Sequence, residues 1–182
     1  MKQEINVLDY TTEIIKALSK GILLTTKAHN RVNTMTIAWG MFGIEWEKPI
    51  FMTLVRKGRF TTDLLKDNPE FTINVPVGDF NKKILGYAGS KSGRDVDKIK
   101  DLDLTLEEPE VISVPGIKEL PLTLECKVIY TQEQDKSCML FPNVDKYYPQ
   151  DVPSTNCGAN QDFHIAYYGE IVKAYIIKDW EN

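Results

Sequence analysis

The sequence predicts a mainly β fold with a few short helices, in which antiparallel strands form a sheet or a barrel. Several segments are rich in β-branched and aromatic residues, which favour strands. Short turns join several of these segments, and the segments do not alternate with helices as repeated βαβ units do. The pattern therefore favours an antiparallel sheet or barrel over a doubly wound parallel sheet.

The first two strands are expected to form a hairpin. Residues 21–26 and 32–39 both have a strand-forming composition, and the polar turn at 28–31 separates them. Read from composition alone, Trp39 at the end of the second strand belongs to the core. Further strands are expected at residues 49–55, 70–77, 120–131 and 163–177.

Short helices are expected between the strands. The first would begin near Thr11 or Thr12, either of which can cap it, and would extend to residue 20. Its buried face would consist of Ile14, Ile15 and Leu18, which recur at helical spacing. Further short helices are expected at about 61–67, 81–88 and 95–100.

The chain of 182 residues fits one domain that runs from residue 1 to residue 182 and is long enough to bury a core. Residues 132–162 differ from the rest, because they hold three prolines, many polar residues and several aromatic ones. A long stretch without regular structure is unusual inside a compact domain and is often functional. We expect an insertion at about 132–162, and its composition leaves open a surface excursion, a subunit contact or a lid.

Charge and composition exclude several classes of function. A formal net charge of −4 argues against general binding to nucleic acid or to acidic membranes, both of which need a basic surface. No apolar run is long enough to span a membrane, and the first residues lack the apolar stretch of a signal peptide. Cys126, Cys138 and Cys157 are odd in number and widely spaced, so free thiols in a reducing cytoplasm are expected. Cys138, Cys157 and His164 match no compact pattern of metal ligands, so no metal is expected.

The segment Arg56-Lys57-Gly58-Arg59-Phe60-Thr61 has the features of an anion site. It carries three cations between a predicted strand and a predicted helix. Gly58 permits a positive φ or a close backbone approach, and Thr61 stands where a helix N-cap would stand. Backbone N–H groups and the helix dipole favour an anion there, and arginine can hold a phosphate through two hydrogen bonds. The same composition is also typical of a solvated basic turn.

A second segment, Ser92-Gly93-Arg94-Asp95-Val96-Asp97-Lys98, has similar features. Small residues precede a predicted helix start, and Arg94 and Lys98 lie about one helical turn apart. We therefore expect both side chains on one face of that helix. Two such segments can share one anionic ligand if the fold brings them together.

Several motifs together resemble the flavin reductase-like family, to which the flavoredoxins belong. They are Asn33-Thr34-Met35-Thr36 with Trp39, Leu54–Thr61, Phe71-Thr72-Ile73-Asn74-Val75-Pro76, and Ser92–Lys98, followed by Leu122–Val128 and His164–Val172. The resemblance covers about residues 15–130 and 163–177, and its most specific part is the Ser92–Lys98 segment. The family usually joins its last strands more directly, so residues 132–162 are a departure from it.

The resemblance implies an antiparallel, Greek-key-like split β-barrel that binds FMN and usually forms a homodimer. It implies that residues 33–39 lie along the isoalloxazine ring, and that the two basic segments hold the phosphate and the ribityl chain. It also matches His164 to a histidine near the flavin. The cofactor site implied in this way consists of Asn33, Thr34, Met35, Thr36, Ala38, Trp39, Arg56, Lys57, Gly58, Arg59, Phe60, Thr61, Ser92, Gly93, Arg94, Lys98 and His164.

The activity that the resemblance implies is that of an FMN-dependent oxidoreductase. Such an enzyme passes electrons from NADH or NADPH through FMN to free flavin or to another acceptor. The alternatives are a flavoredoxin-type carrier, which holds FMN tightly and exchanges electrons with a redox protein, and a non-catalytic flavin-binding protein. Because a flavin supplies the redox chemistry itself, no catalytic triad is required, and no catalytic residue is identified.

Overall fold

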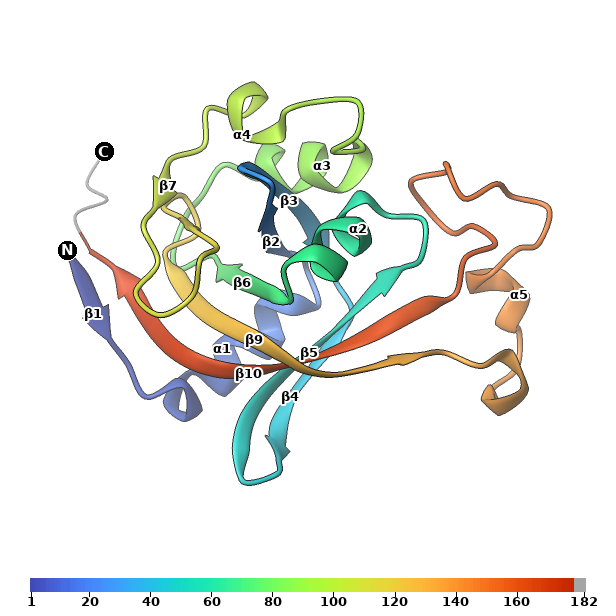
Figure 1. Cartoon of the computed structure of the whole chain (residues 1–182), viewed down its shortest axis with the longest axis horizontal. Coiled ribbons are helices and arrows are strands. Elements are labelled where there is room, and N and C mark those ends of the chain that lie inside the picture. Colours follow the sequence, from blue (N-terminus) through green and yellow to red (C-terminus); the bar gives the residue numbers. More distant parts are fainter. Residues whose placement is uncertain (179–182) are drawn as a thin grey trace.

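The computed structural model describes residues 1–178 and folds them around a strongly bent sheet of eight strands (Figure 1). Each strand pairs with its neighbours in the antiparallel sense, in the order β3-β2-β6-β9-β10-β5-β4, and β1 pairs with β10. The two end strands of this order are not paired with each other, so the barrel is split rather than closed. The strands are β1 (Lys2–Glu4), β2 (Ile22–Ala28), β3 (Arg31–Ile37), β4 (Gly40–Glu45), β5 (Lys48–Arg56), β6 (Glu70–Val75), β9 (Leu122–Glu133) and β10 (His164–Ile177), with a separate pair formed by β7 (Leu106–Glu107) and β8 (Gly116–Ile117).

The long strands β9 and β10 join the two halves of the split barrel. Figure 1 shows both strands curving across the whole sheet. The first half of β10 pairs with β5, and its last residues pair with β1 instead. Register shifts at Tyr168/Gly169 and at Ile171/Lys173 interrupt its pairing with β9, and such irregularities bend a strand. At the start of β10, His164 lies directly opposite Arg56, so the predicted histidine stands beside the predicted basic turn.

The predicted β2–β3 hairpin is confirmed. Its turn consists of His29 and Asn30, whose φ values of 49° and 62° are those of a type I′ turn, which fits the twist of a hairpin. The second strand ends at Ile37 rather than at Trp39, because the chain turns there and enters β4. That strand was not predicted, since two of its residues are glycines, which strands disfavour. Trp39 therefore lies in a connection with 41% of its surface exposed, and its assignment to the core was wrong.

The first helical segment differs from its prediction in how it begins. The 3₁₀ helix η1 (Val7–Tyr10) leads directly into α1 (Thr11–Leu18), so Tyr10 occupies the N-cap position and no threonine caps the helix. Thr11 instead donates its hydroxyl hydrogen to the carbonyl of Leu8, at 3.2 Å. Ile15 was expected in the buried face but is 45% exposed, whereas the other two residues of that face are buried.

The remaining helices are short. The predictions at 61–67 and 81–88 are confirmed to within about two residues, but the one at 95–100 was wrong, because only a single turn forms and it begins at Lys98. Asp97 caps that turn by accepting a hydrogen bond from the Lys100 N–H, at 3.2 Å. Arg94 thus precedes the helix and does not share a helical face with Lys98. The elements are α2 (Phe60–Asp67), α3 (Lys83–Ser90), α4 (Lys98–Asp101), η2 (Lys136–Cys138) and α5 (Val144–Tyr147).

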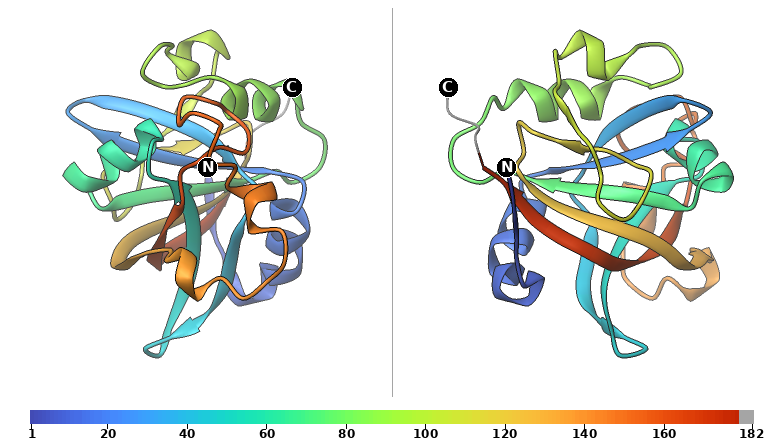
Figure 2. Two further views of the ribbon diagram at one scale, coloured as in Figure 1. Left: turned by 90° about the vertical axis from the view of Figure 1, so that its right-hand side faces the viewer. Right: turned by 60° about the vertical axis from the view of Figure 1, so that its left-hand side comes forward.

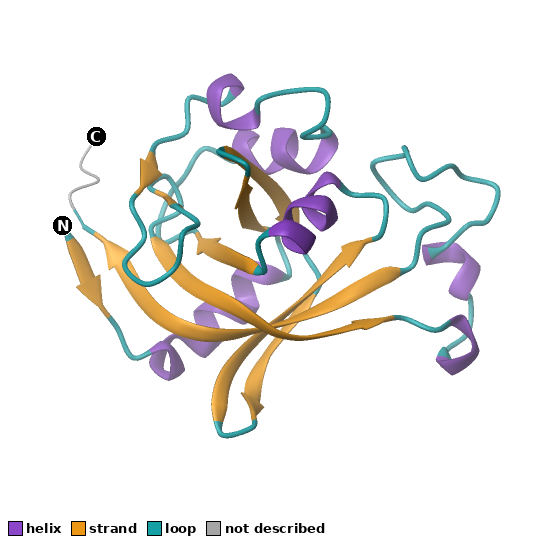
Figure 3. Ribbon diagram, in the orientation of Figure 1, coloured by secondary structure: helices purple, strands orange, loops and turns teal. Residues whose placement is uncertain are grey.

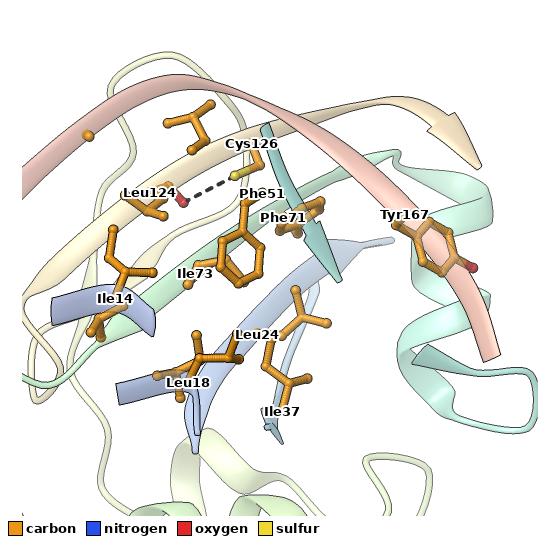
Figure 4. Packing of buried hydrophobic residues seen from close by; sticks show 14 of the residues in the cluster. Ile14, Leu18, Leu24, Ile37, Phe51, Phe71, Ile73, Leu124, Cys126 and Tyr167 are labelled. Atoms are coloured by element: carbon orange, nitrogen blue, oxygen red, sulfur yellow. Dashed lines mark hydrogen bonds between the residues drawn. The ribbon is translucent and has the colours of Figure 1, made fainter. Parts of the chain in front are cut away.

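The main core lies between the bent sheet and α1. Figure 4 shows side chains from α1, β2, β5, β6 and β9 meeting there. Cys126 is fully buried among them, while Cys138 and Cys157 are exposed, and all three thiols are free, as predicted. A second cluster packs α3 and α4 against β2, and Figure 2 shows these two helices together on one side of the sheet. The labelled core residues of Figure 4 are Ile14, Leu18, Leu24, Ile37, Phe51, Phe71, Ile73, Leu124, Cys126 and Tyr167.

Residues 1–178 lack the features of a membrane span and of a metal site. None of the helices in that range has the length and apolar composition that a membrane crossing requires. Within the same range, no three histidine, cysteine, aspartate or glutamate side chains gather closely enough to hold a metal ion. Figure 3 shows that strands and connecting loops make up most of this part of the chain, as the sequence predicts.

Replacing Gly169 by alanine should destabilise the fold. A Cβ atom at this position would overlap the Phe71 ring and would lie 2.9 Å from the Cβ of Cys126, both in the main core. Overpacking of this kind costs roughly 1–3 kcal/mol. Urea denaturation of the purified variant should show a loss of this size in the free energy of unfolding.

Gly43→Ala provides the matched control for Gly169→Ala. A Cβ atom at Gly43 would have no atom within 4 Å, although this glycine also lies in a strand of the same sheet. Its substitution should leave the free energy of unfolding within about 0.5 kcal/mol of the wild-type value, as is usual for surface positions. Equal losses in the two variants would contradict the packing argument.

Candidate functional site

Two adjoining cavities contain most of the residues predicted for the site. The first has a volume of about 230 Å³ and the second about 400 Å³. They share Met35, Arg59, Gly89 and Cys157, so they form one continuous depression. Together they have the size of a site for a small organic ligand or a cofactor.

The first cavity brings the two basic segments together, as a shared ligand requires. The Arg94 guanidinium donates to the carbonyl oxygen of Gly58 at 2.8 Å and to a carboxylate oxygen of Asp63 at 2.6 Å. The Phe60 ring lies under the guanidinium carbons of Arg31 and Arg94, at 4.5 and 5.7 Å from its centroid. Residues 58–61 and residues 91–95 therefore contact each other and both line this cavity.

Lys98 supplies a buried positive charge to the wall of the first cavity. Only 4% of its surface is exposed, and its Nζ donates to the carbonyl oxygens of Thr34 and Ala88 at 2.9 and 2.8 Å. Within residues 1–178, no carboxylate forms an ion pair with it. Burial, followed by the nearby charge of Arg59, lowers the pKa of Lys98 to about 8, so the ammonium is still mostly charged at neutral pH. A buried cation without a counter-ion favours an anion in the adjoining space.

The start of α2 adds further hydrogen-bond donors to the first cavity. The N-cap residue is Arg59, so Thr61 lies inside the helix and its predicted capping role was wrong. Thr61 accepts a hydrogen bond from the Asn33 side-chain amide at 3.1 Å, which fixes the amide against the cavity wall. Phe60 and Thr61 are the first residues of the helix, and their N–H groups have no carbonyl of the preceding turn to bind. The helix terminus and Lys98 thus favour an anion in the same cavity.

Gly93 is required by close contact with β3. A Cβ atom there would overlap the side-chain amide of Asn33 and would lie 2.9 Å from the Phe60 ring. The absence of a side chain lets the loop of residues 91–95 approach both residues. This contact explains the glycine between Ser92 and Arg94 in the most specific motif of the sequence.

Strand β3 contributes to both cavities. Asn33 and Met35 line the first, while Thr36, Ala38 and Trp39 line the second together with Met35. Thr34 lines neither of the two. Its fully buried hydroxyl lies 3.0 Å from the Thr25 hydroxyl on the neighbouring strand, and only its carbonyl contacts Lys98. The predicted contribution of Thr34 is therefore corrected: its side chain is turned to Thr25, and only its carbonyl oxygen takes part, by accepting a hydrogen bond from Lys98. 

The insertion packs over the basic turn and accepts hydrogen bonds from its two arginines. Arg56 is buried and donates to carbonyl oxygens of the insertion, at 2.9 Å for Tyr147 and 2.6 Å for Asp162. It lines the second cavity and not the first, so it does not share a cavity with the second basic segment. Arg59 donates to the carbonyls of Asn156 and Cys157, at 3.1 and 2.6 Å. In Figure 1 the insertion, drawn in orange, extends from the ends of β9 and β10 toward this turn.

The other two residues of the turn have separate roles. Lys57 lines neither cavity, because its ammonium group pairs with a carboxylate oxygen of Glu133 at the end of β9. Its predicted place in the site is therefore corrected. Gly58 has no positive φ, but its N–H donates to Asp162 at 3.0 Å, and a Cβ atom would meet that carboxylate. The close approach at Gly58 is therefore made by the Asp162 carboxylate.

The second cavity has an aromatic wall. The Trp39 ring lies 5.8 Å from the Tyr147 ring and 5.2 Å from the imidazole of His164. Leu54 on β5 adds an apolar surface, and residues 157–159 of the insertion close another side. A flat, partly apolar ligand fits such a wall, since aromatic edges and faces pack against it.

His164 is a neutral hydrogen-bonding group in this cavity. Only 6% of its surface is exposed, and its Nδ1 lies 3.0 Å from the Tyr148 hydroxyl. Burial, with a smaller contribution from the charges of Arg56 and Arg59, lowers its pKa to about 3. The imidazole is therefore uncharged at neutral pH and cannot act there as a protonated acid.

Sequence reasoning missed the contributions of the insertion. Tyr147, Cys157, Gly158 and Ala159 line the second cavity, and Ser154 and Thr155 line the first. The only signal in the sequence was the aromatic and polar composition of residues 132–162 just before His164. That composition indicated a possible lid but identified no individual contact. The structure also adds Leu54, which lies in a predicted strand, and Gly89 and Lys91, which lie between the predicted helix at 81–88 and the segment Ser92–Lys98.

Acid should destabilise the folded chain through His164. The folded-state pKa of about 3 lies below the ordinary value of 6.5, so between these two pH values the unfolded chain binds a proton that the folded chain does not. Stability must then fall as the pH decreases through this window, by up to about 1.4 kcal/mol per pH unit. Urea denaturation at a series of pH values measures this slope. In His164→Asn, which retains a donor for Tyr148, the slope should be smaller, and an unchanged slope would contradict the assignment.

Comparison with known proteins agrees with these features. Residues 18–181 match the flavin reductase like domain family. A curated relative, an uncharacterized protein of Archaeoglobus fulgidus, is 33% identical over 97 residues, which are 53% of this chain and 54% of that protein. The chain thus matches about half the length of this relative.

Solved structures share the fold. The flavoredoxin of Methanosarcina acetivorans is 25% identical, with a TM-score of 0.63 over 89% of this chain and 70% of that one. An FMN-binding domain of a flavin reductase-like enzyme from Shewanella baltica is 17% identical, with a TM-score of 0.65 over 97% and 77% of the two chains, and it shows likeness of fold alone. On the match that spans nearly its whole length, this chain belongs to the flavin reductase-like family.

Proposed function

We propose that this chain binds FMN and acts as an oxidoreductase, passing electrons from NADH or NADPH through FMN to free flavin or to another acceptor. The observation that carries the proposal is the buried ammonium of Lys98, which has no carboxylate partner in residues 1–178 and borders a cavity at the start of α2. A phosphate in that cavity would supply the missing negative charge. Family membership and the flavoredoxin-like fold support a flavin as the carrier of that phosphate.

The residues of the two cavities fit the parts of FMN. Lys98, Ser92 and the N–H groups of Phe60 and Thr61 would hold the phosphate in the first cavity. Met35 and Arg59, which the cavities share, would border the ribityl chain. The ring would lie in the second cavity, against Thr36, Ala38, Trp39 and His164. 

Bound FMN would supply the hydride and electron transfer, and the protein would orient and shield the reaction. Asn33, fixed by its hydrogen bond to Thr61, would keep the wall of the first cavity rigid. The insertion would exclude water, because Tyr147 and residues 157–159 close the second cavity. Neutral His164 would take part in a hydrogen bond with a ligand but would not transfer a proton to it at physiological pH.

The insertion favours a second candidate function, that of an electron carrier that retains FMN. Arg59 and Arg56 attach this segment over both cavities through backbone carbonyls. A lid fixed in this way would slow the release of a bound cofactor. The carrier would then exchange electrons with a redox protein instead of a nicotinamide nucleotide.

We also propose a homodimer and a cytoplasmic location. The β4–β5 hairpin exposes Met41, Ile44 and Trp46, with exposed fractions between 55% and 62%, and Trp46 packs against the exposed ring of Tyr130. Contiguous apolar residues of this kind suit a subunit contact, which size-exclusion chromatography at several concentrations would detect.

The free cysteines are typical of a reducing compartment. Residues 1–182 would form one domain, with the insertion as its lid.

Affinity for FMN should fall as the pH rises through about 8. A bound phosphate favours charged Lys98, whereas the free protein loses this proton near pH 8, so binding above that pH requires proton uptake. Affinity should then decrease by up to about tenfold per pH unit. Riboflavin has no phosphate, and its affinity should not show this decrease. Fluorescence titrations of both flavins on either side of pH 8 measure the difference.

Two lysine variants test the same assignment. Lys98→Gln should weaken FMN binding by roughly tenfold or more, the value of a charge-assisted hydrogen bond, and should remove the decrease above pH 8. Lys57→Gln is the matched control, because that ammonium pairs with Glu133 and lines neither cavity. It should bind both flavins as the wild type does. Equal losses of FMN and riboflavin affinity in Lys98→Gln would argue against a phosphate at this site.

Anaerobic reduction of the FMN-loaded protein separates the two functions. An oxidoreductase of the proposed kind should lose its yellow colour rapidly on addition of NADH or NADPH. A carrier should stay yellow with both nucleotides and bleach only with a reduced redox protein. Protein that binds no FMN in titrations would refute both.

A further inference from the structure

We infer that Gln134 and Tyr148 are positioning residues that hold His164 in a single tautomer, with its proton on Nδ1 and with Nε2 offered to the second cavity as a hydrogen-bond acceptor. Both residues belong to the insertion, and neither lines either cavity. The inference rests on the proposed function for its ligand and deepens it, because it specifies what kind of group the second cavity selects.

The orientation of the Gln134 side-chain amide is fixed by a backbone donor. One terminal atom of this side chain lies 3.3 Å from the backbone nitrogen of His164. A backbone N–H can only donate, so the atom facing it must be the carbonyl oxygen Oε1. The backbone N–H of Gln134 in turn donates to the carbonyl of His164, at 2.9 Å. The two residues therefore bind each other at the point where β9 ends and β10 begins.

This orientation determines where the Tyr148 proton lies. The hydroxyl oxygen of Tyr148 is 2.8 Å from Gln134 Oε1 and 3.0 Å from His164 Nδ1. Oε1 has no hydrogen, so the single hydroxyl proton must point toward it. Burial raises the pKa of Tyr148, so the phenol keeps this proton at neutral pH. 

The Tyr148 oxygen can then only accept from the imidazole. The hydrogen bond to His164 therefore requires a proton on Nδ1, and the neutral ring has no second proton for Nε2. Tyr148 itself is held firmly, because its ring stacks on Phe163 with centroids 4.7 Å apart and lies 5.0 Å from the Arg56 guanidinium carbon. The series of hydrogen bonds from the His164 backbone N–H through Gln134 and Tyr148 to the imidazole is thus satisfied by one arrangement of protons.

Nε2 is the free acceptor of this network. Nothing in residues 1–178 hydrogen-bonds to it, and it is not among the fully enclosed polar atoms of those residues. Since the ring borders the second cavity and its Nδ1 is turned to Tyr148, Nε2 is left for a ligand. A ligand with an N–H or O–H group at this point, such as a carboxamide, would satisfy it. A ligand with only acceptor atoms there would leave two lone pairs facing each other.

The tautomer can be read directly from nitrogen-15 NMR of the protein without flavin. The chain has two histidines, and His29→Gln leaves His164 as the single imidazole in the spectrum. We expect a protonated, pyrrole-type resonance for Nδ1 and an unprotonated, pyridine-type resonance for Nε2 at neutral pH. The opposite assignment would overturn the inference, and because no flavin is present, the result is independent of the proposed function.

Two variants and one control test the positioning role in the same spectrum. Tyr148→Phe keeps the ring packing but removes the acceptor for Nδ1–H, and Gln134→Leu removes the acceptor that directs the tyrosine proton. Both should move the two nitrogen resonances toward each other as the tautomers mix. Tyr130→Phe is the matched control, because the Tyr130 hydroxyl also donates to a glutamine, Gln132, at 3.1 Å but lies far from His164 in an exposed position. Unchanged resonances in Tyr148→Phe, or an equal change in the control, would refute the role.

Two probes test the acceptor itself on the FMN-loaded protein. Nicotinamide carries a carboxamide N–H, and methyl nicotinate has the same ring without a donor. Nicotinamide should shift the Nε2 resonance of His164, methyl nicotinate should not, and His164→Phe should lower nicotinamide affinity by roughly two- to tenfold, the value of a neutral hydrogen bond. No shift with nicotinamide, or the same shift with both probes, would overturn the acceptor role.

Discussion

The guanidinium of Arg56 lies buried at the end of β5 and donates hydrogen bonds to three backbone carbonyls of the insertion. A buried arginine needs acceptors for its N–H groups, and here the sheet supplies the cation while the insertion supplies the acceptors. The segment of residues 134–163 is otherwise poor in regular structure. Its position over the cavities, and with it the aromatic wall and the surroundings of His164, therefore depends on this contact.

The same cation shapes the electrostatics of the second cavity. His164 lies opposite Arg56 in the β5–β10 pairing, and the arginine charge adds to burial in lowering the pKa of the imidazole. One wall of the cavity thus carries a permanent positive charge and another a neutral acceptor. In the first cavity Lys98 provides a second buried cation, and no acid of residues 1–178 pairs with it. The first cavity therefore favours an anionic group, although the net charge of the chain is −4, whereas the second cavity offers a neutral acceptor to a ligand that carries a hydrogen-bond donor.

The insertion contributes to the walls of both cavities at once. The carbonyl oxygens of its residues 156–158 accept hydrogen bonds from Arg59, which lines both cavities. Its Tyr147 lines the second cavity, and its Tyr148 contacts His164 without lining that cavity. Movement of this segment would change the exposure of a bound ligand and the hydrogen bonding of His164 together. A family member without such a segment would need other residues for both tasks.

The sequence alone determined the fold class, the β2–β3 hairpin and the two basic segments that meet in the first cavity. These features are local: alternating apolar residues, turn residues and motif spacing specify them within a few positions of the chain. The sequence also led to most of the residues that line the two cavities, through the resemblance of its motifs. It failed at β4, where glycines weaken the strand pattern, and at the helix near Lys98, where only one turn forms.

Only the tertiary structure decided which cations of the basic turn line the cavities. Arg56, Lys57 and Arg59 are equivalent cations in the sequence. In the fold, Lys57 pairs with Glu133, and Arg56 donates to carbonyl oxygens of the insertion. The same holds for His164, whose proton position depends on Gln134 and Tyr148, 30 and 16 residues earlier in the chain. Such contacts join residues that lie far apart in the sequence and show no helical or strand periodicity relative to each other, so no local pattern predicts them. The folded backbone creates them by bringing the ends of β5, β9 and β10 to one place.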